Sequence, residues 1–133
     1  MKRLQNNNQG FTVIELLVAI LVLLVIAGVA VSNIRGLRAD NRDEMRKRDI
    51  NAIYYQLEAF HERSGYYPQK VSADTLKGLD PDSLKDANEV TLGQAGSEYT
   101  YQARGCKNGK CASFELSTEL EREATYTKLS LNK

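Results

Sequence analysis

The segment QGFTVIELLVAILVLLVIAGVAV, residues 9–31, decides how the rest of the chain is interpreted. From Phe11 to Val31 it contains a single charged residue, Glu15. A helix rises about 1.5 Å per residue, so this run is long enough to cross a hydrocarbon layer of about 30 Å. A carboxylate near the centre of such a run costs about 2.5–3.5 kcal/mol and commonly marks a function that involves a partner. The position of Glu15 therefore needs an explanation.

Two explanations of this segment require no partner. The first is a secretory signal peptide, with a basic start and a small-residue cleavage site at Gly28-Val29-Ala30. The second is a plain single-pass anchor, in which Thr12 and Glu15 form a capping box that satisfies the first amides of the helix. The residue pattern alone leaves both explanations open.

The octapeptide GFTVIELL, residues 10–17, closes a short basic leader and opens the apolar run. It resembles the class III signal of type IV prepilins and type II secretion pseudopilins. The resemblance implies that a prepilin peptidase/methyltransferase cuts between Gly10 and Phe11, on the cytoplasmic side, and N-methylates the new Phe11 amine. It also implies that the apolar helix is retained, and that Glu15 pairs with the Phe11 amine of a neighbouring subunit.

The same resemblance implies an α+β type IV pilin fold, with one long N-terminal α-helix packed on a small antiparallel β-sheet. The implied function is that of a structural subunit of a type IV pilus or pilus-like filament serving motility, adhesion, DNA uptake or protein secretion. Its implied partners are other copies, other pilins, and the pilus assembly platform with its ATPase. The subunit would be stored in the membrane with an extracytoplasmic head, and would then enter an extracellular filament or a cell-envelope pseudopilus.

A hypothesis from another class is a non-polymerising, single-pass membrane-anchored binding module, in which Glu15 serves only as a cap. One departure from the family also stands in the sequence. Many family members carry a proline at the end of the apolar run, where this chain has Ser32.

The helix is expected to continue from Ser32 to Ser64, because no proline interrupts this stretch. Apolar residues recur at three- and four-residue steps in its second half, and Gly65 follows as a C-cap. The turn GYYP, residues 65–68, resembles the turn that ends the long helix in pseudopilins. We therefore expect a cleaved leader at 1–10, a transmembrane and polymerisation helix at 11–31, its amphipathic continuation at 32–65, and a globular head at 66–133.

Charged residues crowd the helix from Arg38 to Asp49. Such a run is typical of a solvated helix face. Its alternating signs would also suit salt bridges between subunits around a filament core. Anionic lipid is a third interpretation, which the interleaved acids weaken.

Three strands are expected in the C-terminal part, at 98–104, 112–120 and 124–131. Asn108-Gly109 is a strong signal for a two-residue hairpin turn between the first two strands. If Lys107 and Lys110 close that turn, Cys106 and Cys111 face each other at a position where a disulfide can form. The alternative is a pair of reduced thiols. Zinc is not indicated, because the chain has no other Cys and no His nearby.

The remaining polar stretch contains four acids that invite a calcium interpretation, Asp80, Asp82, Asp86 and Glu89. Their spacing lacks the third oxygen ligand and the glycine of an EF-hand loop, so no metal site is predicted. Short helices are expected at 72–79 and 82–86, with Asp82 as a cap.

Overall charge points to no particular ligand, because 18 Lys and Arg balance 17 Asp and Glu. The two lysines beside the hairpin turn are typical of a solvated surface and do not by themselves indicate nucleic acid. His61, the only histidine, lies at helical spacing from Leu57 and is interpreted as a packing residue. No phosphate-binding loop, His–carboxylate cluster or serine elbow is visible, so neither an enzyme nor a cofactor is predicted.

Overall fold

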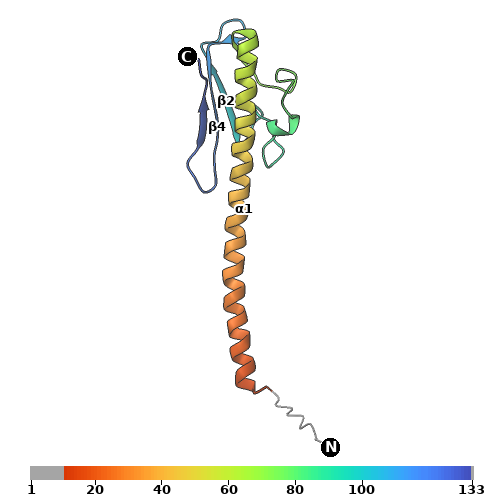
Figure 1. Cartoon of the computed structure of the whole chain (residues 1–133), viewed down its shortest axis with the longest axis vertical. Coiled ribbons are helices and arrows are strands. Elements are labelled where there is room, and N and C mark those ends of the chain that lie inside the picture. The colour runs from red at the N-terminus through yellow and green to blue at the C-terminus, as the bar shows by residue number, and fades with distance from the viewer. Residues whose placement is uncertain (1–10, 133) are drawn as a thin grey trace, which may run out of the picture. The chain divides into compact units, whose positions relative to one another are not determined.

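The computed structural model describes residues 11–132, and it contains one long helix and a small set of strands (Figure 1). The described part divides into two compact units, one ending at Leu37 and one beginning at Arg38. We call the second unit the head. The elements are α1 (Val13–Ser64), β1 (Tyr67–Pro68), the 3₁₀ helix η1 (Pro81–Leu84), β2 (Tyr99–Arg104), β3 (Lys110–Cys111), β4 (Ser113–Thr118) and β5 (Tyr126–Leu129).

Helix α1 ends where the sequence predicts. Gly65 follows the last helical residue, Ser64, and adopts a left-handed φ of 75°, which a residue with a side chain rarely takes. Its N–H donates to the carbonyl of His61 at 2.7 Å and so satisfies one of the last free carbonyls of the helix. The helix runs without interruption through Ser32. The expected α+β class is confirmed.

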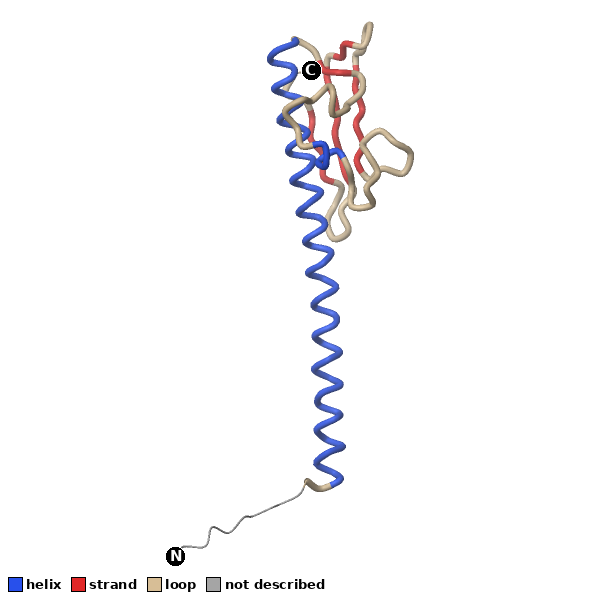
Figure 2. Tube along the Cα trace, turned by 90° about the vertical axis from the view of Figure 1, so that its right-hand side faces the viewer, coloured by secondary structure: helices blue, strands red, loops and turns tan. Residues whose placement is uncertain are grey.

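The main sheet has the antiparallel order β2-β4-β5 (Figure 2). Strands β2 and β4 pair from Tyr99↔Thr118 to Arg104↔Ser113, and β4 and β5 pair from Glu115↔Leu129 to Thr118↔Tyr126. All three strands fall within the ranges expected from their alternating patterns. One face of the sheet packs on the C-terminal half of α1, and the core between them contains Ile50, Ile53, Leu57, Tyr99, Phe114 and Leu116.

Tyr67 joins the end of the helix to this core and is fully buried. Its ring stacks on His61 at 4.4 Å between ring centroids and meets Phe114 edge-on at 4.9 Å. Its hydroxyl donates to Oε2 of the buried Glu58 at 2.8 Å, and the other oxygen of Glu58 accepts from the Leu131 amide at 3.1 Å. His61 is a packing residue, as expected, and the C-terminal segment is held against α1.

The hairpin predicted around Asn108-Gly109 is present. Both residues have positive φ, 51° and 79°, as a two-residue primed turn requires. Lys107 and Lys110 exchange two backbone hydrogen bonds, of 2.8 and 3.0 Å, and a disulfide joins Cys106 to Cys111 directly behind them. Strand β3 then pairs with β1, in the register Pro68↔Lys110, so the hairpin is anchored beside the end of α1.

Two local expectations are wrong. Residues 72–79 form isolated turns, among them Thr75 N–H to Ser72 O at 3.1 Å, and no helix. The 3₁₀ helix η1 is capped by Asp80, whose Oδ1 accepts from the Asp82 amide at 3.1 Å. Asp82 is therefore not the cap. Pro81 explains the shift, because proline favours the first position of a helix and the cap is the residue before it.

Replacing Cys106 by serine and Cys111 by alanine should lower the free energy of unfolding of the head by about 2 kcal/mol. The disulfide closes a small loop, and its effect on the unfolded chain grows with loop length. Thermal unfolding of the full chain in neutral detergent, followed by circular dichroism, measures the loss. The adjacent exposed substitution Ala112→Ser serves as control and should change the midpoint little. An equal midpoint for the cysteine variant would contradict the expectation.

Candidate functional site

The first turn of α1 is capped as the sequence predicts. Thr12 precedes the first helical residue, and its Oγ1 accepts from the Glu15 amide at 3.3 Å, while its carbonyl accepts from the Leu16 amide at 3.1 Å. This is the threonine half of a capping box. Within residues 11–132, the Glu15 carboxylate itself forms no hydrogen bond or ion pair, so local capping does not occupy its charge.

The side chains from Phe11 to Val31 are all exposed within the chain, and Phe11 itself is 82% exposed. An 18-residue window of α1 has a mean hydropathy of 3.1, so by length and composition this part of the helix can cross a membrane. An exposed apolar surface of this extent marks contact with lipid or with another protein. Glu15 is the one ionisable group on it, four residues after Phe11.

Comparison with known families identifies this segment. The prokaryotic N-terminal methylation motif matches residues 5–31.

This match supports the resemblance of the segment to the class III signal of type IV prepilins and pseudopilins.

The match includes Phe11, Glu15 and the whole apolar run, and it ends one residue before Ser32. Gly10, the residue expected before the cut, lies outside the described residues. The pilin-type motif belongs to structural subunits rather than to a class of enzymes. No curated protein and no solved structure gives a match to the chain. The head is therefore interpreted from its own contacts.

A charged cluster occupies the first turns of α1 within the head. Here the loop between β4 and β5 reaches across to the helix, and three exposed ion pairs join the two. The shortest nitrogen–oxygen distances are 2.7 Å for Arg42–Glu121, 2.8 Å for Lys47–Glu123 and 3.3 Å for Arg122–Asp40. We call this set the clamp, and its remaining members are Asp43, Arg46 and Glu98.

Asp43 lies at the centre of the clamp and is only 3% exposed. Its carboxylate accepts from the Glu121 amide at 2.9 Å and the Arg122 amide at 3.0 Å, and from Arg46 at 2.9 Å. Burial alone would raise the pKa of Asp43, but these three donors outweigh it and hold the pKa below its usual value. The aspartate therefore stays charged at neutral pH and fixes the backbone of the β4–β5 loop.

Arg46 is the buried cation of the clamp, at 6% exposed. Its Nε donates to Glu98 at 2.8 Å, and its Nη1 is shared between Asp43 and Glu121, which lies 3.0 Å away. Hydrogen bonds from Arg42 and then Arg46 lower the pKa of Glu121 to about 2. One guanidinium thus joins α1 to both the start of β2 and the β4–β5 loop.

The charged run at 38–49 was expected either to be solvated or to pair with other subunits. The structure instead places Asp40, Arg42, Asp43, Arg46 and Lys47 in contacts within the chain. The acidic segment ELERE, residues 119–123, was the available sequence signal, since its charge complements the basic helix. Complementary charge does not indicate which helix cation pairs with which acid of residues 119–123. The clamp was therefore missed.

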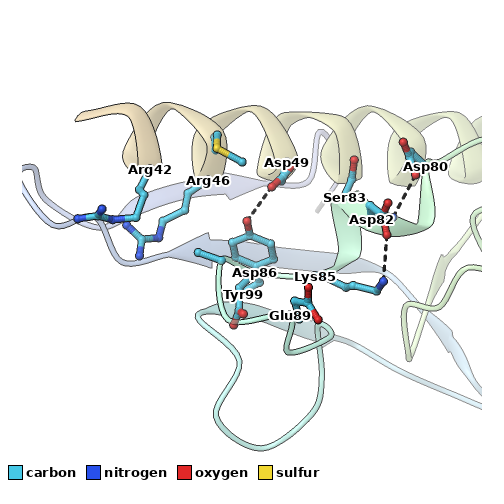
Figure 3. A pocket seen from close by; sticks show the side chains of 12 residues that line it. Arg42, Arg46, Asp49, Asp80, Asp82, Ser83, Lys85, Asp86, Glu89 and Tyr99 are labelled. Carbon is cyan, nitrogen blue, oxygen red and sulfur yellow. Dashed lines mark hydrogen bonds and ion pairs between the residues drawn. The ribbon is translucent and has the colours of Figure 1, made fainter. Parts of the chain in front are cut away.

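A pocket of about 420 Å³ lies between α1 and residues 80–89 (Figure 3). Asp49 of α1 and Tyr99 of β2 both line this pocket, and the Tyr99 hydroxyl donates to the Asp49 carboxylate at 2.8 Å. Burial raises the pKa of Asp49, against the effect of this hydrogen bond.

Three of the four carboxylates that invited a calcium interpretation have partners of their own, and the fourth, Glu89, forms no side-chain hydrogen bond or ion pair among the described residues. Asp86 accepts from the amides of Asn88, Val90 and Glu98, at 2.8–3.0 Å. Asp82 pairs with Lys85 at 2.9 Å, while Asp80 caps η1. The described residues contain no group of three His, Cys, Asp or Glu placed to hold a metal ion. These acids shape the loop.

Asp43→Ala should destabilise the head by about 3 kcal/mol or more, because it leaves two loop amides without their acceptor and removes one of the three carboxylates that pair with the buried Arg46 guanidinium. Chemical denaturation of the full chain in detergent measures the loss. Glu44→Ala is the matched control, since it removes a neighbouring carboxylate that is exposed, and it should cost less than about 0.5 kcal/mol. Equal effects of the two substitutions would show that the clamp does not stabilise the head.

Proposed function

We propose that the chain is a structural subunit of a type IV pilus or pilus-like filament, assembled through the N-terminal part of α1. The observation that carries this proposal is the exposed apolar run from Phe11 to Val31, which bears the methylation motif and the single carboxylate Glu15. Motility, adhesion, DNA uptake and protein secretion are the roles that such a filament serves.

Processing is proposed to occur between Gly10 and Phe11. A prepilin peptidase/methyltransferase would remove the basic leader and methylate the Phe11 amine. The leader contains Lys2 and Arg3, which favours a cytoplasmic location for this end of the chain. The head would then lie on the extracytoplasmic side, and the subunit would stay in the membrane until it is extracted.

Assembly is proposed to depend on Glu15 and on the Phe11 amine of a neighbouring copy. Apolar helices pack in many registers at similar energy, because lipid and leucine are almost equally apolar. Two opposite charges in an apolar layer discriminate among these registers, since a misplaced subunit leaves both unpaired. Other pilins, the assembly platform and its ATPase are the further partners that this proposal requires.

The competing function is that of an anchored binding module that does not polymerise. The hydrogen bond from the Glu15 amide to Thr12 favours it, because it gives the TVIE motif a local structural role. A cap requires no charge pair with another copy. The two functions therefore differ in what removal of the charge does.

Intact-mass spectrometry of the membrane-extracted protein should find a chain that begins at Phe11 and carries one additional methyl group on its amine. A chain that begins at Val31 would indicate ordinary secretion, and an intact Met1 would indicate a plain anchor. The variant Gly10→Val should accumulate unprocessed, because a peptidase site fitted to glycine excludes the larger side chain.

Glu15→Ala should leave membrane insertion intact but reduce filament yield about tenfold or more, since weakening an association by about 1.4 kcal/mol lowers its equilibrium constant tenfold. Electron microscopy and the mass of sheared filaments measure the yield. Thr12→Ala is the matched control, because it removes the cap while keeping the charge, and it should assemble nearly as well as wild type. If Glu15→Ala assembles as well as Thr12→Ala, the Glu15 carboxylate has no role of its own in assembly and the pairing proposal fails.

A further inference from the structure

Strand β5 lies at one edge of the main sheet and pairs with β4 alone. The Ser130 amide donates to the Phe114 carbonyl at 3.0 Å, so the backbone of Ser130 faces β4. Backbone groups alternate in direction along an antiparallel strand, and those of Thr127 and Leu129 therefore face away from β4. Among the described residues no other strand pairs with this side of β5. We call it the open edge, because its amides and carbonyls are available to a further strand.

Exposed leucines line the open edge on the face of the sheet that points away from α1. The register places Lys128 opposite the core residue Leu116, so Lys128 and Tyr126 point toward α1, and Leu129 points to solvent. Leu129 is 61% exposed, and Leu131, two positions on, is 74% exposed. Native sheets usually protect an edge with charged side chains on its exposed face. Leucines at that position indicate a contact with another molecule.

On the face toward α1, the open edge carries one cation. The Lys128 ammonium lies 5.4 Å from the centre of the Tyr54 ring and 5.5 Å from that of Tyr126, and it forms no ion pair among the described residues. Tyr54 in turn meets the exposed Tyr55 edge-on, at 5.4 Å between centroids. The Tyr126 hydroxyl donates to Asn51 at 3.1 Å and fixes β5 on the helix. This face therefore presents positive charge on an aromatic support.

We propose that the open edge binds an extended segment of another protein as a fourth strand of the sheet, and that this segment alternates apolar and acidic side chains. The side chains of a strand point alternately to its two faces. The apolar set then packs on Leu129 and Leu131, and the acidic set approaches Lys128. Backbone hydrogen bonds to Thr127 and Leu129 hold the segment, while its side chains determine which sequence is accepted. This inference goes beyond the proposed function and requires no filament.

A second copy of β5 is a poorer occupant of the open edge. Two β5 strands would pair antiparallel about a two-fold axis. The register that joins Thr127 to Leu129 of the other copy places the two copies of Lys128 directly opposite each other, where like charges destabilise a sheet. The register centred on Leu129 requires the amide of Leu131, which already donates to Glu58 at 3.1 Å. Charge complementarity therefore favours an acidic segment.

The test uses the full chain in non-ionic detergent and a fluorescent peptide of about eight residues that alternates valine and glutamate, with binding followed by anisotropy. A peptide that alternates valine and lysine should bind about tenfold more weakly, because it brings like charge to Lys128. Two further peptides are N-methylated, one at its valines and one at its glutamates, so that each lacks the donors of one edge. One of them should bind about tenfold more weakly than the other, because only one edge of the added strand faces β5.

Thr127→Pro removes an outward amide of β5 and keeps the bonds to β4, since an edge strand tolerates proline where its N–H faces solvent. It should weaken binding of the valine–glutamate peptide about fivefold, as expected for one hydrogen bond. The matched control Thr127→Val keeps the amide and should bind as wild type does. Lys128→Gln should weaken binding about threefold. Lys107→Gln removes an exposed lysine elsewhere on the head and should have no effect.

Thermal unfolding followed by circular dichroism checks that each variant is folded, and Lys128→Gln tests the proposal even if Thr127→Pro does not fold. Equal binding of the two N-methylated peptides, or of the glutamate and lysine peptides, would overturn the proposal. So would unchanged binding in both Thr127→Pro and Lys128→Gln. A dimer of the chain alone that Thr127→Pro dissociates, measured by light scattering, would show that a second copy occupies the open edge instead. Every arm uses the dispersed subunit, so failure here is distinguishable from failure to form filaments.

Discussion

The apolar surface of residues 11–31 cannot be buried by the chain that carries it, and this constraint governs the rest of the molecule. Every side chain in the range is exposed, and the head lies in a separate compact unit. Such a surface needs lipid or other helices around it. Lipid tails and leucine side chains are similar environments, so apolar burial alone distinguishes poorly between storage in a membrane and packing in a filament. We infer that a charged group such as Glu15 supplies the discrimination.

The same helix must become soluble within a few turns, and the clamp lies where that change occurs. The head begins at Arg38, and the buried residues Asp43 and Arg46 follow within it. Replacing a buried ion pair with apolar residues is often neutral for stability. Here such a replacement would extend the apolar stripe toward Ile50, the first core residue of the helix. We infer that the clamp separates the apolar part of α1 from the core of the head.

Local signals predicted most of the fold. Gly65 ended the helix, Asn108-Gly109 placed the hairpin, and that turn in turn set Cys106 opposite Cys111, because each feature depends on residues close together in the chain. The clamp could not be predicted in this way, since its contacts between α1 and the rest of the head join residues at least 52 positions apart, and 78 apart for Asp43 and Glu121. The charged residues at 38–49 have no periodic spacing that would select their partners. Solvent, other subunits and acids of the same chain therefore fitted the pattern equally well. At η1 the covalent constraint of Pro81 overrode the choice of Asp82 as cap.

Ion pairs within the head also explain why the overall composition does not reveal its unpaired positive charge. The chain has nearly equal numbers of acidic and basic residues, which suggests no field of either sign. The clamp neutralises Glu121 and Glu123 with helix cations, so these acids cannot offset the lysines of the hairpin. The attraction of a charged ligand depends on the unpaired charge at one part of the surface and not on the net charge of the chain. In this chain Lys107 and Lys110, beside the disulfide, are exposed and form no ion pair among the described residues, although the molecule as a whole is close to neutral.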